Sequence, residues 1–514
     1  MESRAAQFDA EYYVLEQEFG EQWKADDERV RAKLAELEAR FGKKPNIIKI
    51  LVDDVGYSEL GAYGGGKLRG APTPNLDKMA DQGMKFLQYY SEPSCTPTRI
   101  ALNTGRHPVR VGVNQVIFPG TRGIGLPDEE VTLAELMSDA GYNTAMYGKW
   151  HVGFGDEYAP TEHGFDEAQW SEGNPAPWLQ GSDLNEMTGH ANFGSLAWSS
   201  QDLPAYYDEG GVLRAVKGQK PEMAYEYSLE KYNTYEEEVF DHSIDYIKRK
   251  AQDEKPFFLY IGGKANHFFG AHPDFMDTPA QTNTAAQMVE TDYNLGRLMQ
   301  ALKEEGIEEN TLVVWTSDNG PMYGFHPHGG YSMFDHGEKG STFEGGVRVP
   351  AIAWWPGVIE PGQDPLDIVQ VTDWYTTFAT IAGVDDKLPS DRVVDGVNQT
   401  ALLVMGEDHG RRDYVFLYNK GKVEAIRKDW IKIRFGGLIF VPHYNLMHDP
   451  AERHPNEVNY AAGYSYGMVR VLQEHQKMIE KFPHRVQTPY QRDPDEVFNP
   501  YPELHYQTSK QVDW

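Results

Sequence analysis

The chain contains one cysteine, Cys95, and its surroundings are the first candidates for chemistry. Thr96 and Pro97 follow it, a pair typical of a helix N-cap and first helical residue. We expect a helix over residues 99–104 that ends at Gly105. Cys95 would then lie just outside a helix N-terminus, where unpaired N–H groups and the helix dipole favour anions. Two interpretations stay open: an inert buried thiol, or a nucleophile at an anion-binding site.

Charged and polar side chains also follow four stretches that are typical of β-strands. These side chains are Asp53, Asp54, Lys149, His151, His267, Asp318 and Asn319. In a parallel sheet the carboxyl ends of the strands meet at one edge, where open α/β sheets bind ligands. We therefore expect these groups to converge near Cys95. Lys149 and His151, two residues apart on an extended segment, should point to the same side.

The converging side chains suit a hard cation beside an oxyanion. The oxygen ligands come from Asp53, Asp54, Asp318 and Asn319. Oxygen donors alone suit a divalent cation, with Ca²⁺ expected first and Mg²⁺ or Mn²⁺ as alternatives. The cationic groups for an oxyanion come from Arg99, Lys149, His151 and His267. No cluster of cysteine and histidine has the spacing of a zinc site.

These residues must be positioned by the elements between residues 46 and 382. Apolar runs such as residues 46–52 and 311–317 alternate there with helical patterns such as residues 282–305. The alternation predicts an α/β fold with a large, mainly parallel mixed sheet and helices on both faces. Beyond residue 405, closely spaced short strands, including one at 438–441, predict a smaller antiparallel subdomain, with a packed helix at 464–480.

We divide the chain into an N-terminal helical extension (1–44), the main α/β domain (45–404), the antiparallel subdomain (405–481) and a C-terminal tail (482–514). The extension has an apolar stripe at helical spacing, which Gly20 could interrupt. The stripe packs on the chain itself or on a second copy, and the tail wraps its own domain or a neighbour. We expect a homo-oligomer formed through one or both segments.

Residues 165–231 have little periodicity, and we interpret them as a functional loop region. Four aromatic residues there are candidates for lining a substrate pocket: Trp170, Trp178, Trp198 and Tyr206. Each of them, taken alone, is more often a residue that packs a loop.

Composition excludes several classes of partner. With 48 Lys and Arg against 78 Asp and Glu, the formal net charge is −30, which argues against nucleic acid and anionic membranes. A single cysteine excludes an intramolecular disulfide framework. We recognise no signal peptide and no apolar run of membrane-spanning length. We therefore expect a cytoplasmic protein without a membrane partner.

Six ordered blocks resemble the type I, formylglycine-dependent sulfatases of the alkaline phosphatase superfamily. Cys-Thr-Pro-Thr-Arg at 95–99 with Thr-Gly-Arg at 104–106 resembles the sulfatase signature Cys-x-Pro-x-Arg, with Thr98 where Ser is commoner. The other blocks are Asp-Asp-Val-Gly-Tyr at 53–57, Gly-Lys-Trp-His at 148–151, Ser-Asp-Asn-Gly at 317–320, Lys-Gly-Ser-Thr-Phe-Glu-Gly-Gly at 339–346 and Tyr-Asn-Leu at 444–446. The resemblance covers residues 45–480 and implies an arylsulfatase-like hydrolase of small sulfate esters.

The resemblance also implies a role for each position. Cys95, converted to formylglycine by a maturation enzyme, would be hydrated to a diol; one hydroxyl would coordinate the metal and attack sulfur, giving a covalent sulfo-enzyme intermediate. The metal ligands would be Asp53, Asp54, Cys95, Asp318 and Asn319. Arg99 and Lys149 would hold the diol and a sulfate oxygen, and His151 would take a proton to expel sulfate. His267 and Lys339 would bind sulfate and assist the leaving alcohol.

Three questions stay open at this level. The family usually shows Pro-His where this chain has Asn266-His267, so His272, which precedes Pro273, is a rival for the role of His267. Phosphonate monoester and phosphodiester hydrolases of the same superfamily share most of these groups and are the alternative function. A binding protein on this scaffold is disfavoured, because no catalytic residue type is missing.

Overall fold

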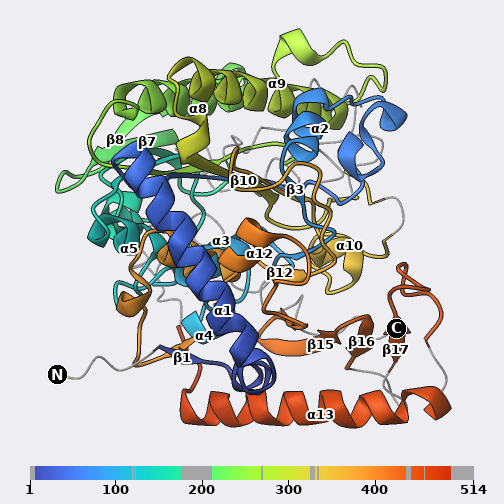
Figure 1. Ribbon diagram of the computed structural model, residues 1–514. Coiled ribbons are helices and arrows are strands. Elements are labelled where there is room, and N and C mark those ends of the chain that lie inside the picture. Colours follow the sequence, from blue (N-terminus) through green and yellow to red (C-terminus); the bar gives the residue numbers. More distant parts are fainter. Residues whose placement is uncertain are drawn as a thin grey trace.

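The computed structural model describes residues 6–117, 121, 123–174, 211–267, 270–323, 330–332, 335–435, 442–455 and 458–487. At its centre lies a nine-stranded mixed sheet in the order β3-β11-β10-β2-β9-β5-β6-β7-β8 (Figure 1). Its strands are β2 (Asn46–Val52), β3 (Met84–Lys85), β5 (Asn143–Lys149), β6 (Glu167–Ser171), β7 (Gly211–Val216), β8 (Glu222–Glu226), β9 (Phe257–Gly262), β10 (Thr311–Ser317) and β11 (Ala351–Trp354).

The strands from β10 to β6 run parallel, and the strands toward both edges are antiparallel. The central strands are buried along their whole length, as expected of apolar runs in a parallel sheet. The large mixed sheet predicted from the sequence is confirmed.

Strand β2 shows why helices must cover both faces of this sheet. Ile47 and Leu51 belong to one hydrophobic cluster, and Ile48, Ile50 and Val52 belong to a second, because successive side chains of a strand point to opposite faces. The second cluster includes side chains of α2 (Pro74–Asp81), α8 (Leu229–Lys250) and α9 (Asn283–Glu304). The first includes side chains of α3 (Cys95–Thr104), α5 (Leu133–Asp139) and α11 (Asp373–Ile381).

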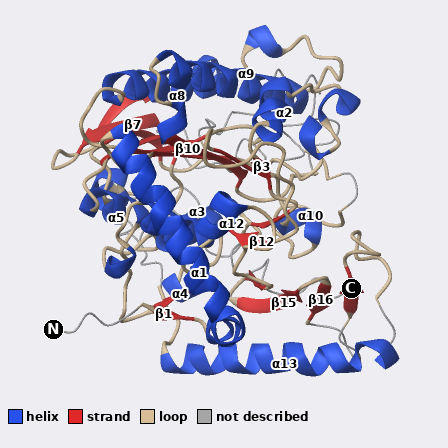
Figure 2. Cartoon of the chain, viewed as in Figure 1, coloured by secondary structure: helices blue, strands red, loops and turns tan. Residues whose placement is uncertain are grey.

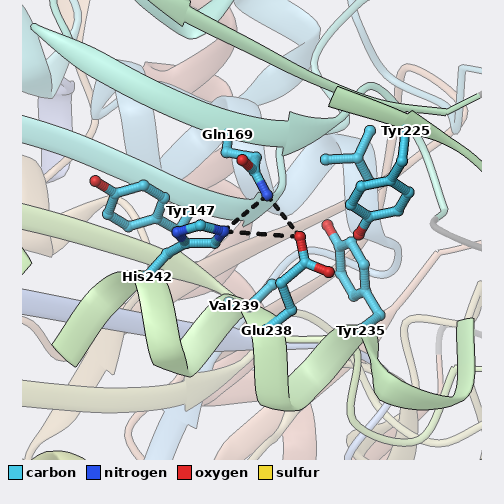
Figure 3. A pocket seen from close by; sticks show the side chains of 8 residues that line it. Tyr147, Gln169, Tyr225, Tyr235, Glu238, Val239 and His242 are labelled. Atoms are coloured by element: carbon cyan, nitrogen blue, oxygen red, sulfur yellow. Dashed lines mark hydrogen bonds and ion pairs between the residues drawn. The ribbon is translucent and has the colours of Figure 1, made fainter. Parts of the chain in front are cut away.

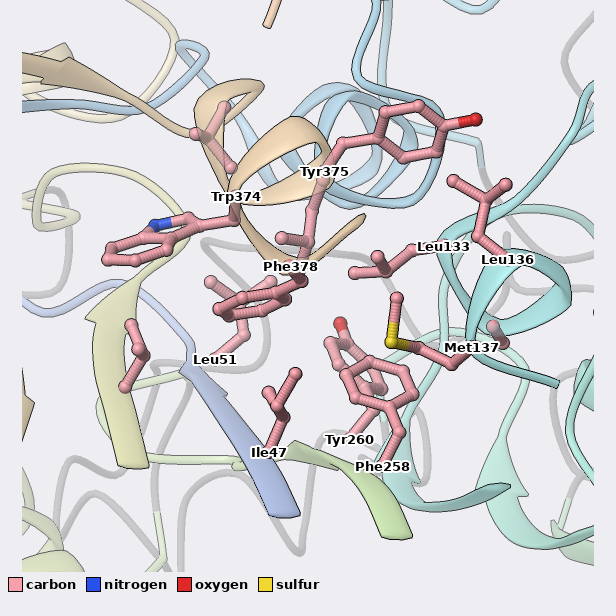
Figure 4. Close-up of a cluster of buried hydrophobic side chains, with 14 of the residues drawn as sticks. Ile47, Leu51, Leu133, Leu136, Met137, Phe258, Tyr260, Trp374, Tyr375 and Phe378 are labelled. Atoms are coloured by element: carbon pink, nitrogen blue, oxygen red, sulfur yellow. The ribbon is translucent and has the colours of Figure 1, made fainter. Parts of the chain in front are cut away.

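Figure 4 shows the first cluster, where α11 and α5 meet the sheet. Trp374 and Phe378 of α11 lie above Leu51 and Ile47, and Met137 of α5 lies beside Phe258. Figure 2 shows the layers that result, with α8 and α9 on one side of the strands and α3 and α5 on the other. Helix α3, which carries Cys95, therefore lies on the same face of the sheet as α5 and α11 and packs against both of them.

A separate four-stranded antiparallel sheet follows the main one, as predicted. It consists of β14 (Tyr414–Asn419), β15 (Lys422–Lys428), β16 (Ile431–Arg434) and β17 (His443–Asn445). Helix α13 (Val458–Lys481) packs on it, and Met468 and Val471 join its hydrophobic cluster. The strand predicted at 438–441 lies outside the described residues.

Helix α1 (Ala10–Phe41) runs as one helix through Gly20, so the predicted interruption there is absent. Its apolar stripe packs on the chain's own body: Leu15 and Trp23 join the cluster of the small sheet, and Leu37 joins that of the main sheet. Figure 1 shows α1 crossing the molecule between the two. This packing buries much of the stripe within the chain itself, whereas Phe19 stays exposed.

Shorter elements complete the described fold. They are α4 (Pro108–Val111), α10 (Glu344–Val347), α12 (Thr400–Met405), the parallel pairs β1 (Gln7–Phe8) with β13 (Val393–Val394) and β4 (Gln88–Tyr90) with β12 (Ile368–Gln370), and the 3₁₀ turns η1 (Gly61–Tyr63), η2 (Gly66–Arg69), η3 (Asp156–Tyr158), η4 (Pro160–His163), η6 (Pro273–Phe275), η7 (Glu308–Asn310) and η8 (Asp385–Lys387). Among the described residues, no helix combines the length and hydropathy needed to cross a membrane.

The stretch at 165–231 differs from the expected loop region. It contributes β6, β7 and β8 to the edge of the main sheet. These strands are short, so the alternation of apolar and polar residues in them is too brief to indicate a strand. Trp170 lies within β6 and is buried in the core rather than lining a pocket. Trp178, Trp198 and Tyr206 lie outside the described residues.

Candidate active site

Cys95 is the first residue of α3, with Ser94 at the N-cap position. The predicted start, with Thr96 as N-cap and Pro97 as first helical residue, was therefore placed two residues too late. Proline is tolerated in the first turn because the N–H groups there have no helical partner. The helix ends as predicted at Gly105, whose φ of 65° is left-handed. Cys95 itself is buried, at 1% exposure.

The acidic side chains predicted as metal ligands converge on Cys95. One ligand atom each from Asp53, Cys95 and Asp318 lie within 4.8 Å of one another, and so do those of Asp53, Asp54 and His267. Asp54 has a left-handed φ of 56°, so the adjacent carboxylates of Asp53 and Asp54 are not separated by strand alternation. The Nδ2 of Asn319 donates to Asp54 Oδ1 at 2.6 Å.

The chemistry of this cluster fits a divalent cation. Asp53 Oδ1, Asp54 Oδ2 and Asn319 Oδ1 are buried and accept no hydrogen bond from a described residue. Burial raises the pKa of Asp54 to about 6. Burial and the neighbouring Asp53 raise the pKa of Asp318 to about 7. Buried oxygens without donors and carboxylates that resist ionisation both indicate a place for further positive charge.

Lysine side chains supply part of the compensating charge. Lys149 forms a buried ion pair with Asp53, and Lys339 Nζ lies 2.6 Å from Asp54 Oδ1. Although burial opposes ionisation of Asp53, Lys149 and His267 hold the pKa of its carboxyl well below the usual range. Both lysines thus face the carboxylates beside Cys95, where an anionic substrate would need them.

Arg99 is fixed one helical turn after Cys95. Its Nη2 donates to Asp318 Oδ2 at 2.9 Å, and its Nη1 donates to the carbonyl of Lys149 at 2.8 Å and lies 3.2 Å from Tyr260 Oη. The signature arginine therefore ties α3 to the ends of β10 and β5. Tyr260 was not predicted as part of the site: alternation places it on the α3 face of β9, but gives no information about its partner.

His151 lies beside these charges, but not for the reason that the sequence suggested. β5 ends at Lys149, and His151 has a left-handed φ of 57°, so the alternation rule for an extended strand does not apply. Its Nε2 lies 2.8 Å from the carbonyl of Ile117, and its buried Nδ1 bonds to no described residue. Burial and the charge of Lys149 keep the pKa of its imidazole well below 6.5.

The structure separates His267 from its rival, His272. His267 is buried with a ring nitrogen near Asp53 and Asp54. His272 precedes the 3₁₀ turn η6, its Nε2 lies 3.4 Å from Glu237 Oε2, and it belongs to neither ligand group of the described residues. Of the two, His267 is therefore the one placed in the cluster.

Among the described residues, no histidine other than His267 belongs to the two ligand groups. His163 is buried at the end of η4, where burial lowers its pKa to about 4. His326 and His328 lie outside the described residues.

A small pocket lies elsewhere, between α8 and the strands β5 to β8 (Figure 3). Its polar wall is formed by Gln169, Glu238 and His242. Gln169 Nε2 lies 2.7 Å from Glu238 Oε1 and 3.0 Å from His242 Nε2, so these groups bond to one another. None of the residues around Cys95 lines this pocket.

Comparison with known proteins assigns this arrangement to a family. The sulfatase family model matches residues 45–384, and the chain belongs to the sulfatase family. The N-acetylgalactosamine-6-sulfatase of Canis lupus familiaris is 34% identical over 405 residues, which are 76% of this chain and 72% of that protein. Human arylsulfatase A is 35% identical over 394 residues, which are 73% and 71% of the two chains. The predicted family is confirmed.

Solved structures agree with the fold. The crystal structure of the PsFucS1 sulfatase from Pseudoalteromonas sp. has a TM-score of 0.81 and 34% sequence identity, and covers 90% of this chain and 96% of that one. A phosphonate monoester hydrolase of Agrobacterium radiobacter has a TM-score of 0.57 with 20% identity, and covers 84% and 96%. At that identity the second likeness concerns the fold alone.

Proposed function

We propose that this sulfatase is an arylsulfatase-like hydrolase that uses a formylglycine made from Cys95 together with a divalent cation. One observation carries the proposal: the acidic cluster of Asp53 and Asp318 surrounds the first residue of α3. An ordinary thiol would not require three buried oxygen atoms nearby that accept no hydrogen bond. The same surroundings suit a hydroxyl nucleophile that acts on an anionic ester.

The cation would be held by Asp53, Asp54, Asp318 and Asn319. Ca²⁺ is the first expectation, because carboxylate and amide oxygens in a partly irregular arrangement suit it, and Mg²⁺ or Mn²⁺ are the alternatives. When bound, such a cation supplies positive charge that offsets the sulfate oxygens and lowers the pKa of a nearby hydroxyl.

Formylglycine supplies a hydrated aldehyde with two hydroxyls, so one can attack while the other is available to a base. Because Cys95 is buried in the folded chain, the maturation enzyme would act before this region folds. His151 is suited to act as the base, since burial and the charge of Lys149 keep its imidazole neutral.

The remaining side chains would bind sulfate and the leaving oxygen. Lys149 and Lys339 lie against the carboxylates of Asp53 and Asp54, so a cation there would release both ammonium groups toward an anion. His267 lies near the same carboxylates and would assist the leaving alcohol. Positive groups fixed before the reaction stabilise the charge that develops on that oxygen.

The sulfate ester could be carried by a sugar or by an aryl alcohol, since the relatives are named for both. We propose 4-nitrophenyl sulfate as the first substrate and N-acetylgalactosamine 6-sulfate as the second. A phenyl phosphonate monoester serves as the comparison substrate, because no described side chain favours the phosphonate alternative.

The deciding experiment is the mass of the proteolytic peptide that contains Cys95, from protein made in its native host. We expect the thiol to be replaced by an aldehyde or its hydrate, and Cys95→Ala to lose at least about 10³-fold in kcat. An unmodified cysteine in active protein would contradict the formylglycine proposal. Exhaustive chelation should remove activity and Ca²⁺ should restore it; activity that survives chelation in unfolded-and-refolded protein would contradict the cation.

A further inference from the structure

Glu59 is a buried carboxyl group that the proposed function does not use. It lies in the loop between β2 and η1 and is 4% exposed. Burial raises the pKa of its side chain to about 8, and Arg69 and backbone N–H groups oppose this rise. A carboxyl group buried at such a cost requires a structural or functional explanation.

Three N–H donors from three different loops converge on the Glu59 carboxyl group. The Gly56 N–H donates to Oε2 at 3.2 Å, and the Tyr331 N–H donates to Oε1 at 2.9 Å. The Asn266 side-chain amide donates to Oε2 as well. One side chain thus connects the turn after Asp54, the residue before His267, and the segment that follows Asn319.

These loops approach one another too closely for extra atoms. A Cβ on Gly56 would lie 2.3 Å from the Tyr331 carbonyl, and a Cβ on Gly330 would lie 3.2 Å from Glu59 Oε1. The Asn266 N–H also donates to the carbonyl of Asp53 at 3.1 Å. The relative position of His267 and Asp53 therefore depends on a few hydrogen bonds. Those that Glu59 accepts are the ones that join all three loops.

We infer that Glu59 is a positioning residue that fixes His267 relative to Asp53 and Asp54. The inference rests on the proposed function for its effect on rate, and on the contacts of Glu59 alone for its effect on the loops. Displacement of a reacting group by about 1 Å can cost about 10²-fold in rate. Glu59 is not adjacent in sequence to Asp53 or Asp54, and it forms no hydrogen bond with either side chain. It would therefore act on them only through the loops that it joins.

The test is Glu59→Gln, which keeps the size of the side chain but replaces one oxygen that can accept from an N–H group by an NH₂ group that cannot. We expect kcat for 4-nitrophenyl sulfate to fall about 30-fold, with KM within threefold, because the displaced groups act on charge that develops in the transition state. We also expect the affinity for Ca²⁺, measured by calorimetry, to fall at least fivefold. Glu59→Asp keeps a carboxyl group at this position and should recover part of kcat.

Glu11→Gln is the matched control. Glu11 is also a buried carboxylate with cationic donors, Lys428 Nζ at 3.0 Å and Arg470 Nη2 at 3.0 Å, but these lie on the small sheet and α13. This variant should lower Tm while leaving kcat and Ca²⁺ affinity unchanged.

The inference is overturned if Glu59→Gln keeps wild-type kcat and Ca²⁺ affinity, or if Glu11→Gln lowers both as much. If the wild-type protein hydrolyses no ester, the proposed function fails, and the Ca²⁺ measurement then decides the role of Glu59 by itself. A wild-type protein that neither hydrolyses esters nor binds Ca²⁺ overturns both.

Discussion

At Cys95 two opposing influences act on the thiol. Burial raises its pKa, while Lys149 and Lys339 lower it, and burial prevails. The unmodified thiol would therefore stay protonated at neutral pH and would be a poor nucleophile, since the thiolate is the reactive form. The site makes chemical sense when this position carries oxygen rather than sulfur, which is what the formylglycine proposal supplies.

A second residue with unusual protonation is Glu290 of α9. It accepts the His272 N–H at 3.2 Å. Burial raises its pKa from 4.5 to about 7, while the charge of Lys264 lowers the pKa and that of Glu236 raises it. Between these values the folded state binds more protons than the unfolded state, so this carboxyl lowers stability as pH rises through that window.

We predict that Glu290→Gln changes the pH dependence of stability. At pH 8 the variant should be more stable by about 3 kcal/mol, because each pKa unit between 4.5 and about 7 corresponds to about 1.4 kcal/mol and the amide avoids a buried charge. At pH 4.5 the two proteins should differ little. Denaturant unfolding at both pH values measures this, and an equal difference at the two would contradict the raised pKa.

At the scale of elements, the end of α3 is as constrained as its start. Gly105 has a left-handed φ of 65°, and a Cβ there would lie 2.4 Å from Cδ1 of the Tyr375 ring of α11. The glycine thus serves two purposes: it ends the helix, and it lets α11 pack against the helix that carries Cys95.

Gly105→Ala should destabilise the protein by at least about 3 kcal/mol, the sum of a left-handed alanine and an overpacked contact. Gly42→Ala is the control, because Gly42 ends α1 with a similar φ of 72° but a Cβ there meets nothing within 4 Å. The control should cost about 1 kcal/mol. Urea unfolding measures both, and equal losses would exclude a contribution from the Tyr375 contact.

At the scale of the whole molecule, buried charges join segments that are far apart in the sequence. Asp9 Oδ2 lies 2.6 Å from Arg110 Nη2 and 2.7 Å from His475 Nδ1, and Arg110 also pairs with Asp395. The N-terminal segment, the short helix after α3 and helix α13 therefore share one network. Although burial opposes it, His475 and Arg110 lower the pKa of Asp9.

Asp9→Ala should destabilise the protein by about 3 kcal/mol at pH 7, because Arg110 and His475 lose a buried partner. The loss should shrink as pH falls below about 4, where the wild-type unfolded state takes up a proton and Asp9 contributes less. Glu309→Ala, which breaks an exposed pair with Arg40, should cost about 0.5 kcal/mol or less. Thermal unfolding at pH 7 and pH 4 compares them, and similar losses for the two variants would contradict the network.

Much of the fold and of the candidate site follows from local sequence. The central strands are apolar runs bounded by polar residues, and a strand's end fixes where the next side chains emerge, so Asp53, Lys149 and Asp318 could be placed on one edge. The donor types at these positions also indicate the kind of ion and anion. These inferences use only residues that are close together in the sequence and one rule of sheet topology, because a hydrophobic pattern is a local property of the chain.

Only the tertiary structure decided the rest. It placed His267 rather than His272 near Asp53, put Cys95 inside the first turn of α3, and brought Glu59 against donors at Gly56, Asn266 and Tyr331. It also made residues 211–226 part of the main sheet. Such outcomes depend on contacts between residues up to hundreds of positions apart and on left-handed backbone at Asp54 and His151, which the surrounding packing imposes and local propensity opposes.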